Sequence, residues 1–189
     1  MGNLTVEQVE ADVNYLMDSL DSNKRLIPSS SVLLKKVSLI PLLSVVLSFI
    51  STVVFYFSAE WNEKTITGYM HFLATEGWAV VVPTTIIGLF FVLLTYNKLL
   101  MYLTLPDDVR NKSIILQHLH KVTSRIISLF IFLMVCSGVL AAMSPWFCFA
   151  IPALLLVMMF AMGIVIGSEV SRLGSGMALE KISKLVKNI

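Results

Sequence analysis

The sequence predicts an all-α integral membrane protein with four transmembrane helices, and three observations support this fold class. Of its 189 residues, 57% are hydrophobic and 14% are charged, whereas about one quarter are charged in an average soluble domain. Four apolar runs each reach the roughly 20 residues that a helix needs to cross a bilayer. Lys and Arg are concentrated in alternate connecting segments, as in multi-pass proteins. The lipid bilayer is therefore an expected partner.

A polar N-terminal segment, residues 1–36, precedes the first span and is expected to be cytoplasmic. Within it, residues 5–20 predict an amphipathic helix, and Thr5 and Gln8 have capping-box spacing. This helix packs against the protein's own cytoplasmic helices, or it forms a docking or dimerisation seam. Because the first 30 residues are polar and acidic, no cleavable signal peptide is expected. The apolar stripe is Val6, Val9, Val13, Leu16 and Leu20, and the acidic residues around it are Glu7, Glu10, Asp12 and Asp18.

The transmembrane domain is predicted to cover residues 37–167. The apolar runs lack the alternation of apolar and polar residues that is typical of barrel strands. We therefore expect helices, which satisfy the backbone hydrogen-bonding groups in lipid. Ser144 and Pro145 separate the last two spans, which are therefore expected to form a tight hairpin. The predicted spans are residues 37–58, 78–97, 126–143 and 146–167.

The distribution of basic residues predicts the orientation. Of fourteen Lys and Arg residues, thirteen lie in the N-terminal segment, in the loop 98–125 or in the tail, and only Lys64 lies in the loop 59–77. The positive-inside rule then places both termini in the cytoplasm and the loop 59–77 outside. The three tryptophans, Trp61, Trp78 and Trp146, fall near the outer face, where indole rings favour the interface.

The cytoplasmic loop 98–125 is expected to be a helical hairpin. No helix breaker follows the second span before Pro106, so its helix should continue to Leu105, and Asp107 or Asp108 could cap the next one. The apolar positions of that next helix are Ile114, Ile115, Leu119, Val122 and Ile126.

The tail, residues 168–189, predicts a basic amphipathic helix that follows a joint at Gly174 and Gly176. Such a helix binds the membrane surface or packs on the cytoplasmic hairpin. Its apolar face would be Ala178, Ile182, Leu185 and Ile189, with Lys181, Lys184 and Lys187 elsewhere.

The side chains that carry chemistry are sparse. The middles of the spans contain no Asp, Glu, Lys, Arg or His, although ion-coupled transporters need such groups. Cys136 and Cys148 form no C-x-x-C motif, and His118 and His120 are expected to point to different sides of a helix. The sequence therefore predicts a non-enzymatic protein with no catalytic, cofactor-binding or metal site. A net charge of +2 without a basic stripe argues against a nucleic-acid partner.

Pairs of small residues four positions apart predict close helix packing. The packing lies inside the bundle, or it forms a face between two copies of the chain in a homo-oligomer. The pairs are Gly163 with Gly167, Gly138 with Ala142, and Ser44 with Ser48.

The outer loop 59–77 is the predicted site of partner recognition, because aromatic residues are enriched at binding hot spots. The alternative is that its aromatic residues simply lie at the lipid interface, with residues 67–72 forming a short interfacial helix. The candidate recognition residues are Trp61, Glu63, Lys64, Tyr69, His71 and Phe72.

This layout, including the segment Arg25-Leu26-Ile27-Pro28-Ser29 before the first span, resembles the inner-membrane entry-exclusion (surface-exclusion) proteins of conjugative plasmids, of the TraS type. The resemblance covers the whole chain and rests on layout rather than on a diagnostic motif. It implies a multi-pass protein of the bacterial inner membrane that blocks redundant conjugative DNA transfer by recognising a donor mating-pair component of the TraG type. The layout is also similar to that of immunity proteins against pore-forming bacteriocins. A helper subunit of a larger membrane complex is a third interpretation.

Overall fold

A computed structural model of the chain describes residues 5–21, 28–59 and 64–187. The regular elements within these ranges are all helical. Their order is α1 (Val6–Asp21), α2 (Ser30–Ser58), α3 (Ile66–Phe72), the π-helical turn η1 (Leu73–Gly77), α4 (Trp78–Thr104), α5 (Asp107–Lys112), α6 (Ile114–Leu140) and α7 (Trp146–Lys187).

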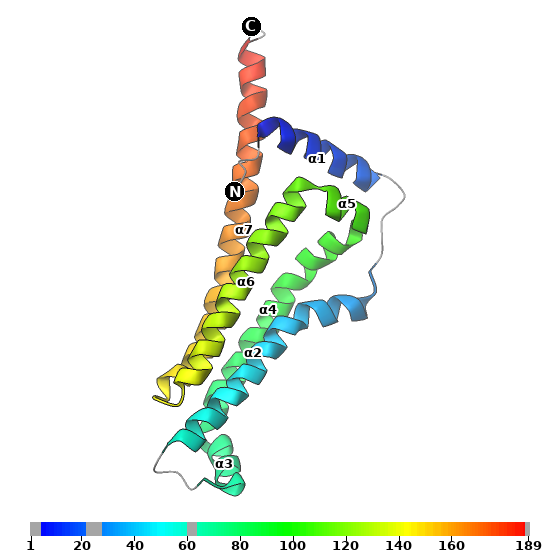
Figure 1. Ribbon diagram of the computed structural model, residues 1–189. Helices are drawn as coiled ribbons and strands as arrows, with labels where there is room; N and C mark the ends of the chain where they lie inside the picture. Colours follow the sequence, from blue (N-terminus) through cyan, green and yellow to red (C-terminus); the bar gives the residue numbers. More distant parts are fainter. Residues whose placement is uncertain (1–4, 22–27, 60–63, 188–189) are drawn as a thin grey trace.

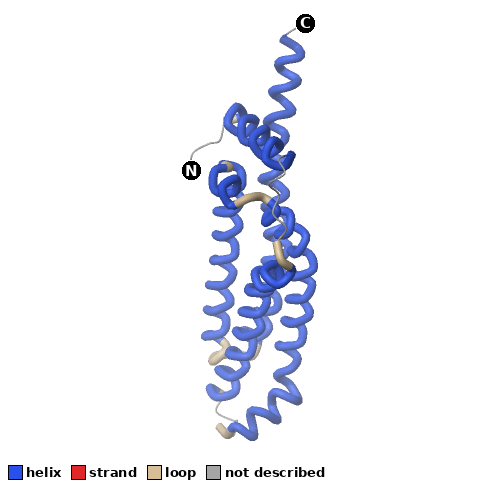
Figure 2. The backbone as a smooth tube through the Cα atoms, turned by 90° about the vertical axis from the view of Figure 1, so that its right-hand side faces the viewer, coloured by secondary structure: helices blue, strands red, loops and turns tan. Residues whose placement is uncertain are grey.

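Four long helices form a narrow, elongated bundle (Figures 1 and 2). α2 packs mainly against α4 and α6 packs mainly against α7, while further contacts join α2 to both α6 and α7, and α4 to α7. Each of the four contains a stretch long and apolar enough to cross a membrane, which confirms the predicted number of spans.

α1, α5 and the end of α7 gather at one end, here called the terminal end (Figure 1). α3 and the α6–α7 turn lie at the opposite end, here called the α3 end.

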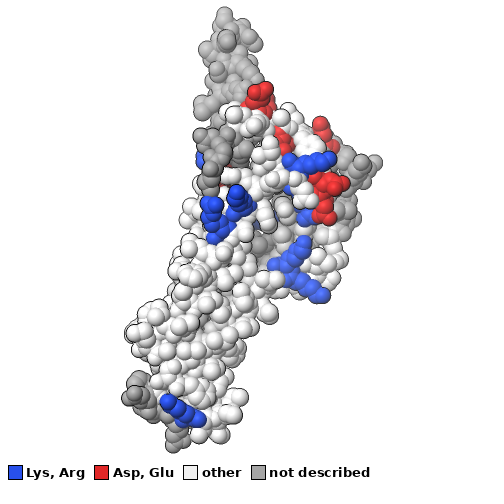
Figure 3. All heavy atoms as spheres, viewed as in Figure 1, with Lys and Arg blue, Asp and Glu red and all other residues white. Residues whose placement is uncertain are grey.

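The surface of the bundle is divided by charge. On the face in Figure 3, the charged side chains gather mostly near the terminal end, basic atoms are also visible at the α3 end, and the middle is uncharged. Large apolar side chains of this middle region point outward, as expected where lipid replaces water. They include Leu42, Leu89, Leu93, Phe132, Val157 and Phe160.

The connection between α4 and α6 is helical, as predicted, but its caps differ from the expectation. α4 ends at Thr104, one residue before the expected end. Asp107 and Asp108 lie in the first turn of the short helix α5, after Pro106 at its cap position. Ser113 caps α6, since its Oγ accepts a hydrogen bond from the Leu116 backbone nitrogen at 3.2 Å.

Both ends of the last helical pair differ from the predicted boundaries. α6 ends at Leu140, and a turn over residues 141–143 replaces the last part of the predicted third span. α7 continues through Gly174 and Gly176 to Lys187, so the expected joint and separate tail helix are absent from this described stretch. The proposed apolar face at residues 178–189 lies outside the side chains that the structure describes.

α1 lies across the terminal end and contacts α6 and α7. Its first turn carries the predicted capping box, with Thr5 N donating to Gln8 Oε1 at 3.2 Å and Gln8 N donating to Thr5 Oγ1 at 3.3 Å. Asp12 is only 8% exposed, although the sequence pattern placed it in the polar surround. Its Oδ2 accepts hydrogen bonds from Ser113 Oγ at 2.7 Å and from the Ile115 backbone nitrogen at 2.9 Å. α1 therefore packs on its own chain and supplies a carboxylate to the first turn of α6, where backbone N–H groups need partners.

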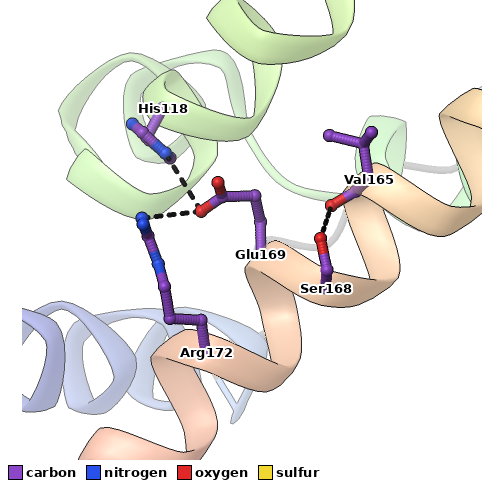
Figure 4. Close-up of polar contacts among 5 residues, drawn as sticks. All are labelled: His118, Val165, Ser168, Glu169 and Arg172. Carbon is purple, nitrogen blue, oxygen red and sulfur yellow. Dashed lines mark hydrogen bonds and ion pairs between the residues drawn. The ribbon is translucent and has the colours of Figure 1, made fainter.

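A second polar link joins α6 to α7 near the terminal end. Glu169 Oε2 lies 3.4 Å from His118 Nε2 and 2.7 Å from Arg172 Nη2 (Figure 4). His120, two residues along α6, instead lines a surface groove beside α4. The two rings of the His118-Leu119-His120 sequence thus point to different sides, as predicted.

The core between the spans combines apolar side chains with buried hydroxyl groups. Ser48 Oγ and Thr84 Oγ1 share a hydrogen bond of 3.1 Å between α2 and α4, and Ser44 Oγ donates to Met134 Sδ at 3.5 Å. Ser44 and Ser48 are both buried, which confirms this small-residue pair as a packing face. The apolar cluster at the centre of the bundle is Phe91, Met134, Ile151, Leu155, Met158 and Met162.

The closest approach of glycine backbone to a neighbouring span is at Gly88, which the small-residue pattern missed. A Cβ atom there would lie 3.0 Å from Pro41 Cβ on α2. By contrast, Gly163 and Gly167 are exposed, and a Cβ atom at either would have no heavy atom of another element within 4 Å. The prediction that this pair packs against another helix of the chain is therefore wrong, and a face between two copies stays a prediction.

The predicted pair of Gly138 and Ala142 is also not a packing seam. Gly138 is buried in α6, yet a Cβ atom there would meet nothing within 4 Å. Ala142 is exposed and lies in the turn after α6. The helix ends between these two positions, so their four-residue spacing does not place them on one helical face.

Candidate functional site

The α3 end is built from a short helix that leads into the second span. Thr65 starts α3, because its side-chain oxygen accepts a hydrogen bond from the Gly68 backbone nitrogen at 3.1 Å. α3 then passes through η1 into α4. A short helix was expected over residues 67–72, and the structure shows one with bounds Ile66–Phe72.

Two of the predicted recognition residues anchor this helix to α2. The Tyr69 ring lies 5.6 Å from the Tyr56 ring, and the Phe72 ring lies 5.4 Å from the same ring. The Tyr69 hydroxyl also shares a hydrogen bond of 3.2 Å with Thr52 Oγ1. Tyr69 and Phe72 are half-buried, and their contacts with α2 hold α3 in position. Their assignment as partner-facing residues stays a prediction.

The opposite side of α3 is open. Ile66 is 76% exposed and Met70 is 58% exposed, and these residues lie one helical turn apart on the same face. Lys64 and His71 are exposed beside them. We call these four residues, Lys64, Ile66, Met70 and His71, the α3 ridge.

The candidate recognition residues chosen from the sequence include Lys64 and His71 but not Ile66 or Met70. The signal for the missed pair was their four-residue spacing, which brings two apolar side chains together on a helix. Trp61 and Glu63, the remaining predicted recognition residues, lie outside the described residues.

A cavity of about 400 Å³ adjoins this end, between α2, η1 and the start of α7. Thr52, Phe55 and Phe72 line one part of it, and Glu76 is the charged residue among those that line it. Cys148 lies at its wall, with Sγ 3.5 Å from the Ser51 carbonyl oxygen. A mostly apolar pocket with a few polar groups is typical of sites that accept an apolar side chain or small ligand.

The part of the chain that the structure describes contains no group of three or more His, Cys, Asp or Glu side chains arranged to hold a metal ion. Cys136 is half-buried, Cys148 is buried, and both are free thiols. The α3 end displays the exposed apolar side chains of Ile66 and Met70 beside the Lys64 cation and the His71 imidazole.

Comparisons with protein-family models, with curated proteins and with solved structures find no match to this chain.

Proposed function

We propose that this chain is a non-enzymatic membrane protein that recognises another protein through the α3 ridge. More specifically, it acts as an inner-membrane entry-exclusion protein that blocks redundant conjugative transfer by recognising a donor component of the TraG type. The observation that supports recognition is the α3 ridge itself. Aromatic contacts with α2 hold this short helix in place while Ile66 and Met70 remain exposed.

The orientation in this proposal follows from the distribution of charge. In the sequence, thirteen of the fourteen Lys and Arg residues lie in residues 1–36, 98–125 and 168–189, and Lys64 alone lies in the loop 59–77. On the face in Figure 3, the described charged side chains gather mostly near the terminal end. By the positive-inside rule, the terminal end faces the cytoplasm. The α3 ridge then faces outward, where a component of a donor cell can reach it.

Reporter fusions test this orientation. We expect fusions at residue 30, at residue 112 and at the C-terminus to report the cytoplasm, because thirteen of the fourteen basic residues lie on that side. A fusion near Lys64 should report the outer side of the membrane. An outward-facing reporter at residue 112 would overturn the four-span orientation.

A mating assay tests the function. Recipients that express the chain should take up a related conjugative plasmid less often than recipients with an empty vector. Met70→Ala should weaken this exclusion, since hot-spot truncation costs about 2 kcal/mol, more than tenfold in affinity. Met143→Ala is the matched control, because Met143 is an exposed methionine outside the α3 ridge.

Replacing residues 60–76 by the loop of a relative with different specificity should transfer that specificity.

Other outcomes identify the alternatives. If exchange of residues 1–30 or 107–121 changes specificity and the loop exchange does not, the recognition surface lies at the terminal end. If the intact protein reduces transfer from none of a panel of conjugative plasmids, the entry-exclusion proposal fails. Survival of cells challenged with a pore-forming bacteriocin would then favour an immunity protein.

A further inference from the structure

A groove of about 560 Å³ lies between α4, α6 and α7, in the half of the bundle nearer the terminal end. α7 packs against both α4 and α6 and contributes Gly163 to the lining. The part of the groove nearer the middle of the bundle is apolar. Its lining there includes Phe91, Leu94, Met159, Phe160, Met162 and Ile164.

Gly163 borders open space in this groove. A Cβ atom at this position would have no heavy atom of another element within 4 Å. No described helix therefore packs against this glycine, and any larger side chain there would project into the groove. The exposed glycine, which the small-residue pattern assigned to helix packing, leaves space in the groove where a side chain would otherwise lie.

The other end of the groove carries basic side chains among the apolar Leu99, Leu116 and Leu119. Lys98 and His120 line it and are exposed. Tyr102 lines it as well, and the guanidinium carbon of Arg110 lies 5.1 Å from the centre of the Tyr102 ring. Arg110 also forms an ion pair with Asp107.

A shallow surface depression adjoins this basic end and shares His120 with it. Lys121 and Arg125 line the depression together with Ser124 and Ser128. None of the described residues that line the groove or the depression is acidic. The apolar part of the groove thus leads to a cluster of basic side chains and hydroxyl groups.

We propose that the groove binds an anionic phospholipid, with one acyl chain along the apolar part and the phosphate beside Lys98 and His120. The three helices that form the groove each contain a stretch long and apolar enough to cross a membrane, so lipid would surround the groove in a bilayer. Basic pockets between transmembrane helices at a membrane surface are a recurrent form of site for anionic headgroups. This inference rests on the membrane-spanning helices and the charge of the groove, and it is independent of the entry-exclusion proposal.

Native mass spectrometry of the full-length protein in detergent tests the site. Phosphatidylglycerol and phosphatidylcholine with the same acyl chains are added separately, and the bound fraction is measured. We expect phosphatidylglycerol to bind more tightly. Gly163→Leu should weaken its binding about tenfold, because the leucine side chain displaces a few methylene groups of the acyl chain.

The matched control for the groove is Gly167→Leu. Gly167 lies one turn along α7, is exposed, and also has no neighbouring atom within 4 Å of an added Cβ, but it does not line the groove. Its replacement should leave lipid binding unchanged. Equal binding by the two leucine variants would overturn the proposal.

The headgroup contact is tested separately. Lys98→Gln should reduce the preference for phosphatidylglycerol over phosphatidylcholine, whereas Lys112→Gln, at an exposed position of α5 outside both surfaces, should not. Equal affinity of the wild type for both lipids would contradict the proposal. So would a dimer that Gly163→Leu dissociates without any change in lipid binding, since the groove would then hold a second copy of the chain.

Discussion

Leucine at position 88 is expected to push α2 and α4 apart and to destabilise the bundle. A Cβ atom at Gly88 would already lie 3.0 Å from Pro41 Cβ, and the next Pro41 atom, Cα, lies at 3.8 Å. A proline ring is rigid and its Cα belongs to the backbone, so α2 cannot make room by changing a rotamer. Overpacking of a well-packed core typically costs about 1–3 kcal/mol and occasionally more.

The same displacement would stretch the nearby hydrogen bond between Ser48 and Thr84, which is 3.1 Å long. Hydrogen bonds between transmembrane helices contribute about 0.6 kcal/mol on average. The free energy of unfolding, measured by titrating mixed micelles with a denaturing detergent, should therefore fall clearly for Gly88→Leu. Gly167→Leu introduces the same side chain into open space and should cost little. Similar losses for the two variants would mean that α2 and α4 are not in close contact at Gly88.

Alanine at position 12 is expected to release α1 from the rest of the protein. Asp12 Oδ2 is the acceptor for Ser113 Oγ and for the Ile115 backbone nitrogen, and the carboxylate is buried between α1 and α6. Hydrogen bonds to charged groups contribute about 1.5–3 kcal/mol. Without the carboxylate, the Ser113 hydroxyl and the Ile115 N–H would lose their acceptor and favour contact with water over contact with α1.

Hydrogen exchange followed by mass spectrometry measures this release. Backbone amides of α1 should exchange faster in Asp12→Ala, and those in the first turn of α6 should follow. Asp18→Ala removes an exposed carboxylate of the same helix and should leave the exchange of α6 unchanged. Unaltered exchange of α1 in Asp12→Ala would show that apolar contacts such as that of the buried Val9 suffice to hold it.

Local signals in the sequence were sufficient where neighbouring residues along the chain make the interaction. The four apolar runs predict four spanning helices, because only a helix satisfies a lone backbone segment in lipid. The capping box of Thr5 and Gln8 forms as predicted, since its partners are three residues apart. The helical character of the loop 98–125 followed from the absence of a breaker before Pro106.

Signals that depend on a second element were ambiguous. The spacing of Gly163 and Gly167 says that they share a helical face, but it does not say whether another helix covers that face. The structure leaves this face open and places the tight contact at Gly88, which lies one turn after the buried Thr84 and was not among the predicted pairs. Likewise, the sequence did not show that the rings of Tyr69 and Phe72 lie against α2.

The sequence by itself determined the class of the protein, the number of its spans and the asymmetry of its charge, because hydropathy and charge are properties of each segment alone. Only the tertiary structure decided which residues face a neighbour and which remain open. Asp12 shows the physical reason most directly. Its carboxylate accepts hydrogen bonds from Ser113 and Ile115 at the start of α6, about one hundred residues further along the chain. No local sequence pattern contains these donors.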